Sequence, residues 1–228
     1  VLAREVSMEE LAEIRRNTDI QIEAFIHGAM CISYSGRCTL SNHMSMRDAN
    51  RGGCSQSCRW KYELFDMPFA QEHRSLTENG DVTEEFSMSA VDMSMIEHIP
   101  DLIENGVDSL KIEGRMKSEF YVASVVKAYR EALDSYLENP SNYKFKDEWM
   151  DMLRKVSHRP YHTGFYLGVN GEQNYDDAGY VRDYEIVGMV KSYDPETKTA
   201  TVLQKNRVFE NDEVAVSYTH LTLPTTPY

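Results

Sequence analysis

The sequence predicts an α/β fold that ends in a smaller β-rich region. A strand–helix–strand pattern opens the chain, and a further predicted strand runs into a long amphipathic helix at residues 107–138. After residue 181, short segments alternate apolar and polar side chains. Strand–helix–strand units build parallel sheets, whereas alternation with a period of two is typical of half-buried strands. We therefore expect a parallel sheet with helices, followed by a small antiparallel β domain.

The first unit begins with a short apolar run at residues 1–6, which predicts a strand. Ser7 is followed three residues later by Glu10, a spacing typical of a capping box, so we expect a helix to start after Ser7. Residues 20–26 alternate apolar and polar side chains and predict the second strand, which contains Glu23.

The middle of the chain predicts shorter elements. Residues 62–69 and 86–91 each predict a strand, the first of which could instead be an irregular return. Residues 95–105 predict a short helix that Pro100 can interrupt and that Gly106 ends.

The second strand–helix unit combines a strand at residues 107–112 with a helix at residues 117–138. One stripe of this helix has apolar spacing and is predicted to face the core. Its members are Val122, Val125, Val126, Tyr129 and Leu133. A helix ending at residues 149–156 follows, and then three predicted antiparallel strands at residues 184–190, 199–203 and 213–216.

All four cysteines lie within 28 residues, and this cluster is the most specific feature of the sequence. They are Cys31, Cys38, Cys54 and Cys58. Disulfides suit small secreted domains, and zinc sites usually present two short cysteine pairs, of which only one is approximated here. The wide spacing favours four thiolates that ligate an iron–sulfur cluster, with zinc and disulfides as alternatives.

The cysteine segment is basic although the chain carries a formal charge of −13. Between Cys31 and Tyr62 there are five cationic side chains and one carboxylate, a net charge of +4. Such an island indicates an anionic partner, either a phosphate backbone or a carboxylate substrate. The residues predicted to bind it are Arg47, Arg51, Arg59 and Lys61. Alternatively, these cations offset the charge of a thiolate-ligated cluster.

The sequence lacks the usual peptidase motifs. It contains neither a Gly-x-Ser-x-Gly elbow nor a His-Glu-x-x-His helix. His158 and His162 are four residues apart, but Pro160 between them breaks the helix that a shared metal site would need. If all four cysteines ligate a cluster, none remains as a nucleophile.

Three segments together resemble the peptidase U32 family, the collagenase-like peptidases. They read EAFIHGAMCISYSGRCTLS, RDANRGGCSQSCRW and VDSLKIEGRMKSEFYVASVVKAYREALD. The likeness extends over about residues 1–210. It implies the C-terminal part of a TIM-like (β/α) barrel in residues 1–139, with the cluster loop at 23–62. A helix and linker at 140–180 and a truncated small β-barrel domain beginning at 181–215 would follow.

Within this family the chain most resembles the bacterial tRNA hydroxylation group. That resemblance implies formation of 5-hydroxyuridine at the wobble position of tRNA, with prephenate as a linked small molecule and a [4Fe–4S] cluster as cofactor. The family name implies a second function, hydrolysis of collagen or gelatin. A third hypothesis is a non-catalytic iron–sulfur scaffold that works with a partner protein subunit.

The strand ends carry the predicted catalytic residues, which match the family's motif blocks. They are Glu23, His27, Lys111, Glu113 and Arg115, and Glu5 is expected to join them. Lys111 and Glu113 point to the same side of a strand, so they could instead form an internal ion pair.

The ends and the location of the chain give further expectations. No run of 18 apolar residues predicts a membrane span, and the free thiols favour the cytoplasm. The chain opens on Val1, as a fragment would. Residues 216–226, VSYTHLTLPTT, resemble the translation of a sequencing adapter, so we expect residues 216–228 to be an artefactual tail.

Overall fold

The computed structural model describes residues 1–63, 85–168, 179–214 and 216. The chain divides into two compact units, Val1–Glu113 with Arg159–Tyr180, and Gly114–His158 with Val181–Tyr228. Among the described residues, no helix has the length and apolar character needed to cross a membrane.

The first unit is organised on a four-stranded sheet in the order β5–β1–β4–β6. These strands are β1 (Glu23–Ala29), β4 (Asp92–Ser94), β5 (Ser109–Ile112) and β6 (Tyr161–His162). β1 is parallel to β5 and β4 is parallel to β6, whereas β1 and β4 are antiparallel. The α/β class with a parallel component is therefore confirmed. The antiparallel pair differs from the all-parallel pattern of a (β/α)₈ barrel, and the TIM-like barrel stays a prediction.

Helix α1 (Met8–Asn17) begins as predicted. The Ser7 side chain accepts the backbone N–H of Glu10, and the Glu10 side chain accepts that of Ser7. The predicted strand at residues 1–6 is wrong, because the chain turns before the cap. Among residues 1–6, all of them described, a single backbone N–H bonds to β1, that of Leu2 to the Glu23 carbonyl (2.9 Å).

Strand β1 starts and ends three residues later than the predicted strand at 20–26. Pairing decides these limits: Gly28 and Ala29 lie opposite Met93 and Asp92 of β4, which extends the ladder beyond residue 26. On one face of β1, Ala24 and Ile26 are completely buried.

The segment before β5 differs from its prediction in two places. Residues 87–91 are not a continuous strand, because regular pairing occurs in β3 (Glu85–Phe86) and then in β4. The helical segment divides into η4 (Ile96–His98) and α3 (Ile99–Glu104). Pro100 lies in the first turn of α3, where its missing N–H is not needed, so it starts the helix rather than interrupting it.

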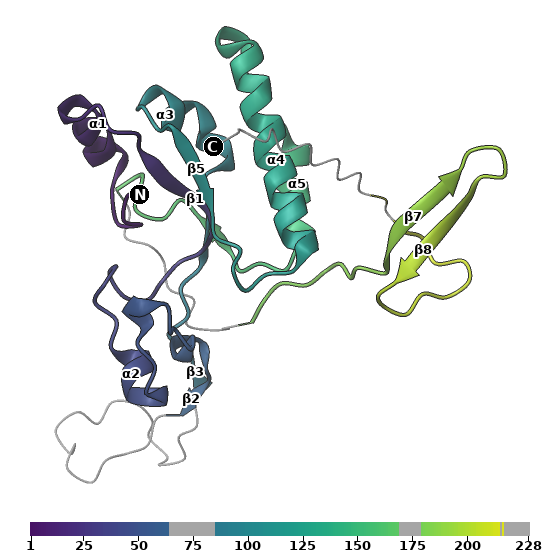
Figure 1. Ribbon diagram of the computed structural model, residues 1–228, viewed down its shortest axis with the longest axis horizontal. Helices are drawn as coiled ribbons and strands as arrows, with labels where there is room; N and C mark the ends of the chain where they lie inside the picture. Colours follow the sequence, from purple (N-terminus) through teal and green to yellow (C-terminus); the bar gives the residue numbers. More distant parts are fainter. Residues whose placement is uncertain (64–84, 169–178, 215, 217–228) are drawn as a thin grey trace, which may run out of the picture. The chain divides into compact units, whose positions relative to one another are not determined.

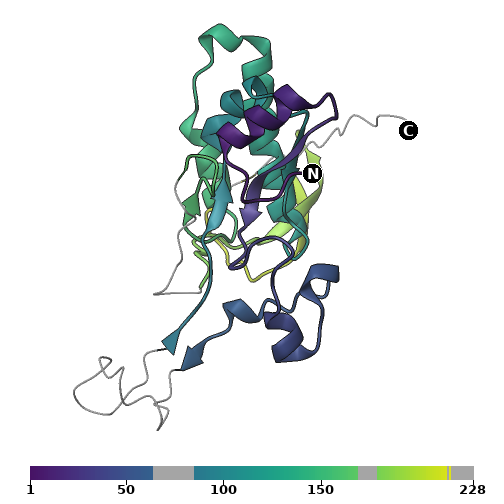
Figure 2. The same cartoon turned by 90° about the vertical axis from the view of Figure 1, so that its left-hand side faces the viewer.

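The cysteine segment contains only short elements. They are α2 (Leu40–Ser45), η1 (Ala49–Arg51), η2 (Ser57–Arg59) and β2 (Tyr62–Glu63), and β2 pairs with β3. Both views place α2, β2 and β3 beyond the carboxyl end of β1, whereas α1 and α3 lie at the opposite end (Figures 1 and 2). Most of the strand predicted at 62–69 lies outside the described residues.

The second unit contains α4 (Glu119–Glu138), η5 (Pro140–Asn142), α5 (Asp147–Arg154) and the hairpin β7 (Gly188–Asp194) with β8 (Thr199–Gln204). The buried face of α4 includes Tyr121, Val125, Tyr129 and Tyr136. Val122 is 38% exposed, so the face of α4 that is buried is rotated by about one residue from the predicted stripe.

The C-terminal predictions are confirmed only in part. The hairpin supplies two of the three predicted antiparallel strands, but β7 starts and ends four residues later than the strand predicted at 184–190. Residues 213, 214 and 216 do not form a strand. The small β-barrel remains a prediction. Residues 217–228 lie outside the described residues, so the artefactual tail also remains a prediction.

Candidate cluster and substrate site

The four cysteines follow the carboxyl end of β1 and are all free thiols. Cys31 comes two residues after the strand and is exposed, and Cys54 is also exposed. Cys38 and Cys58 are partly buried. The disulfides considered from the sequence are therefore not formed in this structure.

The four sulfurs share one electrostatic neighbourhood. Burial raises the pKa of the Cys58 thiol, the adjacent Arg59 guanidinium lowers it, and the charges of Cys31, Cys54 and Cys38 raise it further. Gln56 adopts a left-handed backbone conformation, and its backbone N–H donates a hydrogen bond to Cys54 Sγ at 3.4 Å. Hydrogen bonds to sulfur are one of the means by which proteins tune iron–sulfur clusters.

The donor set fits a four-thiolate cluster in its chemistry. In the described ranges, however, no three His, Cys, Asp or Glu side chains are grouped closely enough to hold a metal ion. The thiols would therefore have to draw together around a cluster.

A set of serines supports the cysteine segment, and no pattern in the sequence marks them. Ser41 is 1% exposed, and its hydroxyl accepts the Ser55 amide at 3.2 Å. Ser45 Oγ donates to the Ser41 carbonyl and lies 2.9 Å from Ser55 Oγ. These bonds join α2, which follows Cys38, to Ser55, which follows Cys54. Short hydroxyl side chains therefore fix the loop around these two predicted ligands.

The predicted anion-binding cations fall into two groups. Arg47, Arg51 and Lys61 are exposed. Arg59 is partly buried and donates to the Tyr180 hydroxyl at 3.2 Å and to the Met30 carbonyl at 3.4 Å. Arg59 is thus held by contacts on both sides beside Cys58, and its role in anion binding stays a prediction.

Two ion pairs flank Phe25 on β1. Lys111 Nζ lies 3.0 Å from Glu23 Oε1, and Arg4 Nη2 lies 3.2 Å from Glu113 Oε2. The guanidinium carbon of Arg4 is 3.9 Å from the centre of the Phe25 ring, and Lys111 Nζ is 5.5 Å from it. The ion pair considered between Lys111 and Glu113 is replaced by these two pairs, because each side chain has a partner on another segment.

The Glu23 carboxylate is stabilised in its charged form. Its pKa lies below the usual value, first because Lys111 donates a hydrogen bond and second because Ser109 donates another. Glu23 and Lys111 are thus held as a pair along β1 and β5, about one-third exposed.

The other two predicted catalytic residues are His27 and Arg115, and the Glu113 backbone N–H donates to the His27 carbonyl at 2.9 Å. His27 is fully buried, and its ring centre lies 5.3 Å from that of Tyr161 on β6. The β1–β5 register shifts between Phe25 and His27, so the strand does not continue its simple alternation there. Arg115 is exposed and belongs to the second unit.

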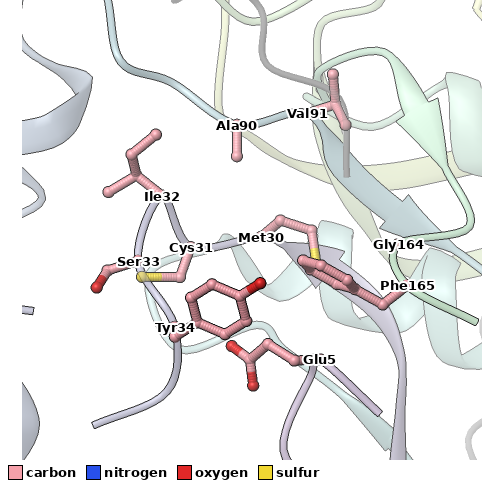
Figure 3. A pocket seen from close by; sticks show the side chains of 10 residues that line it. All are labelled: Glu5, Met30, Cys31, Ile32, Ser33, Tyr34, Ala90, Val91, Gly164 and Phe165. Carbon is pink, nitrogen blue, oxygen red and sulfur yellow. The ribbon is translucent and has the colours of Figure 1, made fainter. Parts of the chain in front are cut away.

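A small pocket of about 60 Å³ opens where β1 leads into the cysteine segment. Figure 3 shows Glu5, Tyr34 and Phe165 around it, with Cys31 in the same wall. Glu5, which was predicted to join the strand-end residues, accepts hydrogen bonds from Ser35 of the cysteine segment.

The comparisons with known proteins identify the family. The sequence profile of Peptidase family U32 matches residues 1–176. The chain belongs to this family. No solved structure matches the U32 chain significantly.

Among curated proteins, the U32 chain is 48% identical to a tRNA hydroxylation protein P1 of Bacillus subtilis (strain 168), over 94% of the chain and 50% of that protein. It is 39% identical to an uncharacterized protease of Methanocaldococcus jannaschii, over 85% and 46% respectively. It is also 41% identical to a 23S rRNA 5-hydroxycytidine synthase of Escherichia coli (strain K12), over 60% and 20%. The chain therefore spans about half the length of the first two relatives.

The U32 chain also contains a buried ion pair that no pattern in the sequence indicated. Asp92 and Arg159 are both 1% exposed, and the Asp92 carboxylate accepts the Arg159 backbone N–H at 3.1 Å. Their side chains approach to 3.5 Å, and the Arg159 guanidinium lies 4.2 Å above the Tyr180 ring. Since Tyr180 also bonds Arg59, a continuous set of contacts links β4 to the residue after Cys58.

Proposed function

We propose that this chain is part of an iron–sulfur-dependent U32 protein that hydroxylates tRNA, forming 5-hydroxyuridine at the wobble position with a prephenate-linked donor. The observation that carries the proposal is the 48% identity, over 94% of the chain, to a protein named for tRNA hydroxylation. The similarity to an rRNA 5-hydroxycytidine synthase supports the same class of RNA modification.

The cofactor in this proposal is a [4Fe–4S] cluster held by Cys31, Cys38, Cys54 and Cys58. Free thiols in one electrostatic neighbourhood and the amide directed at Cys54 Sγ support it. When bound, such a cluster would supply one-electron transfer, because four thiolates cap all four irons. Zinc is the alternative occupant of the same thiols.

The chain's own residues would position the substrates. Arg47, Arg51 and Lys61 are exposed in the basic segment and would bind RNA phosphates or the carboxylates of a prephenate-like donor. Arg59 would hold the Cys58 region in place through Tyr180. Glu23, His27, Lys111, Glu113 and Arg115 remain the proposed catalytic set.

The proposed architecture is the C-terminal part of a TIM-like barrel followed by the start of a small β-barrel. β1 and β5 would be adjacent parallel barrel strands, and the parallel pair in the sheet supports this. A tRNA substrate and four reduced thiols both call for a cytoplasmic location.

Metal content is the first experiment. The protein is expressed anaerobically, and iron, sulfide and zinc per chain are measured with the visible absorption spectrum. We expect about four iron and four sulfide, lost in Cys54→Ser and retained in the matched control Thr39→Ala, an exposed residue beside Cys38. Zinc alone, or metal-free thiols, would contradict the cluster.

RNA binding and hydrolysis separate the competing functions. Salt-dependent tRNA binding, together with restored 5-hydroxyuridine in tRNA from cells lacking the native protein, is expected for the proposed function. Gelatin cleavage without RNA binding would instead support a peptidase. A cluster with neither activity would support the scaffold hypothesis.

A further inference from the structure

The pocket beside Cys31 has the features of a binding site for a small planar ligand. Ten residues line it, drawn from the start of the chain, the segment after β1, the approach to β4 and the segment after β6. Its volume is about 60 Å³ on a measure in which one water needs about 10–15 Å³. It therefore has room for about four to six waters.

Glu5 gives the pocket a directed hydrogen-bond acceptor. Its Oε1 accepts the Ser35 amide at 2.8 Å and the Ser35 hydroxyl at 3.1 Å. Within the described part of the chain, the other carboxylate oxygen has no hydrogen-bond partner. The carboxylate and the Tyr34 ring line the same pocket (Figure 3), so this second oxygen can accept a hydrogen bond from a bound ligand.

Aromatic side chains form one wall of the pocket. The Tyr34 and Phe165 ring centres are 6.2 Å apart and the rings are tilted by 42°. Tyr34 is 66% exposed, which leaves part of its ring open to stacking. Bases stack readily on such rings because every base has a π face.

The charge of the pocket selects against anions. Glu5 is the one charged side chain among the lining residues, and the described pocket wall contains no cation. A carboxylate placed beside Glu5 would be repelled. The ligand is therefore neutral or cationic, planar, and carries an N–H that points to Glu5.

We propose that this pocket binds the uracil base of the substrate, with its N3–H donated to Glu5 and its ring against Tyr34. This inference rests on the proposed function and adds a position for the base next to Cys31. An anionic donor and the RNA phosphates would bind elsewhere, at the exposed cations Arg47, Arg51 and Lys61.

Photo-crosslinking with free 4-thiouridine tests the pocket directly. The protein is irradiated with the nucleoside under near-ultraviolet light, and the modified peptides are mapped by mass spectrometry. We expect crosslinks at Tyr34 or Phe165, competed by uridine and unaffected by an aromatic dicarboxylate. Crosslinks only outside the lining residues, or none, would overturn the inference.

The variant Glu5→Gln makes the test specific. Its amide oxygen can still accept from Ser35, which leaves an NH₂ donor facing the N3–H of the base. We expect crosslinking to fall about tenfold, the effect of losing a hydrogen bond to a charged group. Glu13→Gln, at an exposed position in α1, is the matched control and should crosslink like the original protein. Circular dichroism establishes that both variants fold, and equal crosslinking in Glu5→Gln would overturn the role of Glu5.

If Glu5→Gln does not fold, Tyr34→Leu replaces it, and unchanged crosslinking to Phe165 in that variant would overturn the stacking role of Tyr34.

The same preparation distinguishes this inference from the proposed function. tRNA binding is measured in parallel by filter retention. Absence of tRNA binding together with pocket crosslinks would contradict the function and leave the nucleoside site standing. tRNA binding without pocket crosslinks would contradict the nucleoside site and leave the proposed function standing.

Discussion

Arg59 donates a hydrogen bond from its guanidinium to the Tyr180 hydroxyl at 3.2 Å, across 121 residues of sequence. The same tyrosine ring lies 4.2 Å from the guanidinium carbon of Arg159. Tyr180 thus joins an arginine of the cysteine segment to an arginine buried beside β4. This contact is one of several that hold the cysteine segment, together with the bonds from Arg59 to the Met30 carbonyl and from Ser35 to Glu5.

Removal of the Tyr180 hydroxyl should loosen the cysteine segment. Tyr180→Phe keeps the ring under Arg159 but loses the bond to Arg59, at a cost of about 1–3 kcal/mol in local stability. Hydrogen exchange of the amides at residues 54–59 should accelerate. Tyr184→Phe, at an exposed tyrosine, is the control and should leave exchange unchanged. Equal protection in both variants would contradict the positioning role of Arg59.

Breaking the buried Asp92–Arg159 pair should cost far more than breaking a surface pair. Arg159→Met leaves the buried Asp92 carboxylate without its guanidinium, and we expect a loss of about 3–5 kcal/mol in the free energy of unfolding. Urea denaturation measures this loss. Arg154→Gln, in the exposed Arg154–Asp151 pair, should cost less than about 1 kcal/mol. A small loss in Arg159→Met would show that the pair contributes little.

Structural features that depend on residues close together in the chain could be predicted from the sequence. The Ser7–Glu10 capping box depends on residues three apart, and the structure has both of its hydrogen bonds. The face of α4 could not be predicted as reliably, since two adjacent stripes are both apolar. The stripe with Tyr121 and Tyr129 is buried and Val122 is exposed, a choice that tertiary packing makes.

The candidate site shows the same contrast between local features and features set by tertiary packing. Spacing alone indicated that the four cysteines share one neighbourhood. The partners of Lys111 and Glu113 could not be predicted, because Arg4 lies 109 residues from Glu113 and has no regular element to place it. Asp92 and Arg159 likewise meet only through the pairing of β4 with β6.

Gly28 should tolerate no side chain. Its φ is +114°, and an added Cβ would lie 2.5 Å from the Glu113 carbonyl oxygen. Gly28→Ala combines backbone strain with this overlap, so we expect a loss of about 2–5 kcal/mol in unfolding free energy. Gly36 also has a positive φ, +75°, but open space around it. Gly36→Ala should therefore cost only about 1–2 kcal/mol. Equal losses in thermal or urea unfolding would contradict the close approach.

The Glu23–Lys111 pair should make stability depend on acidic pH. The folded-state pKa of Glu23 lies below its usual value of 4.5, chiefly because Lys111 donates to it and next because Ser109 does. A carboxyl group with a lowered folded pKa contributes stability that is complete above its unfolded pKa. That contribution is lost as pH falls through the folded pKa.

Lys111→Met should therefore destabilise the protein at neutral pH and have progressively less effect as the solution is acidified below the usual pKa of Glu23. Urea unfolding at a series of pH values measures the difference between the variant and the original protein. Lys127→Met, in the partly exposed Lys127–Glu131 pair of α4, is the control. A difference between Lys111→Met and the original protein that stays constant down to strongly acidic pH would mean that Lys111 stabilises the fold by packing against Phe25. A difference that closes in acid assigns the stabilisation to the charged carboxylate, because protonation removes the charge that Lys111 holds.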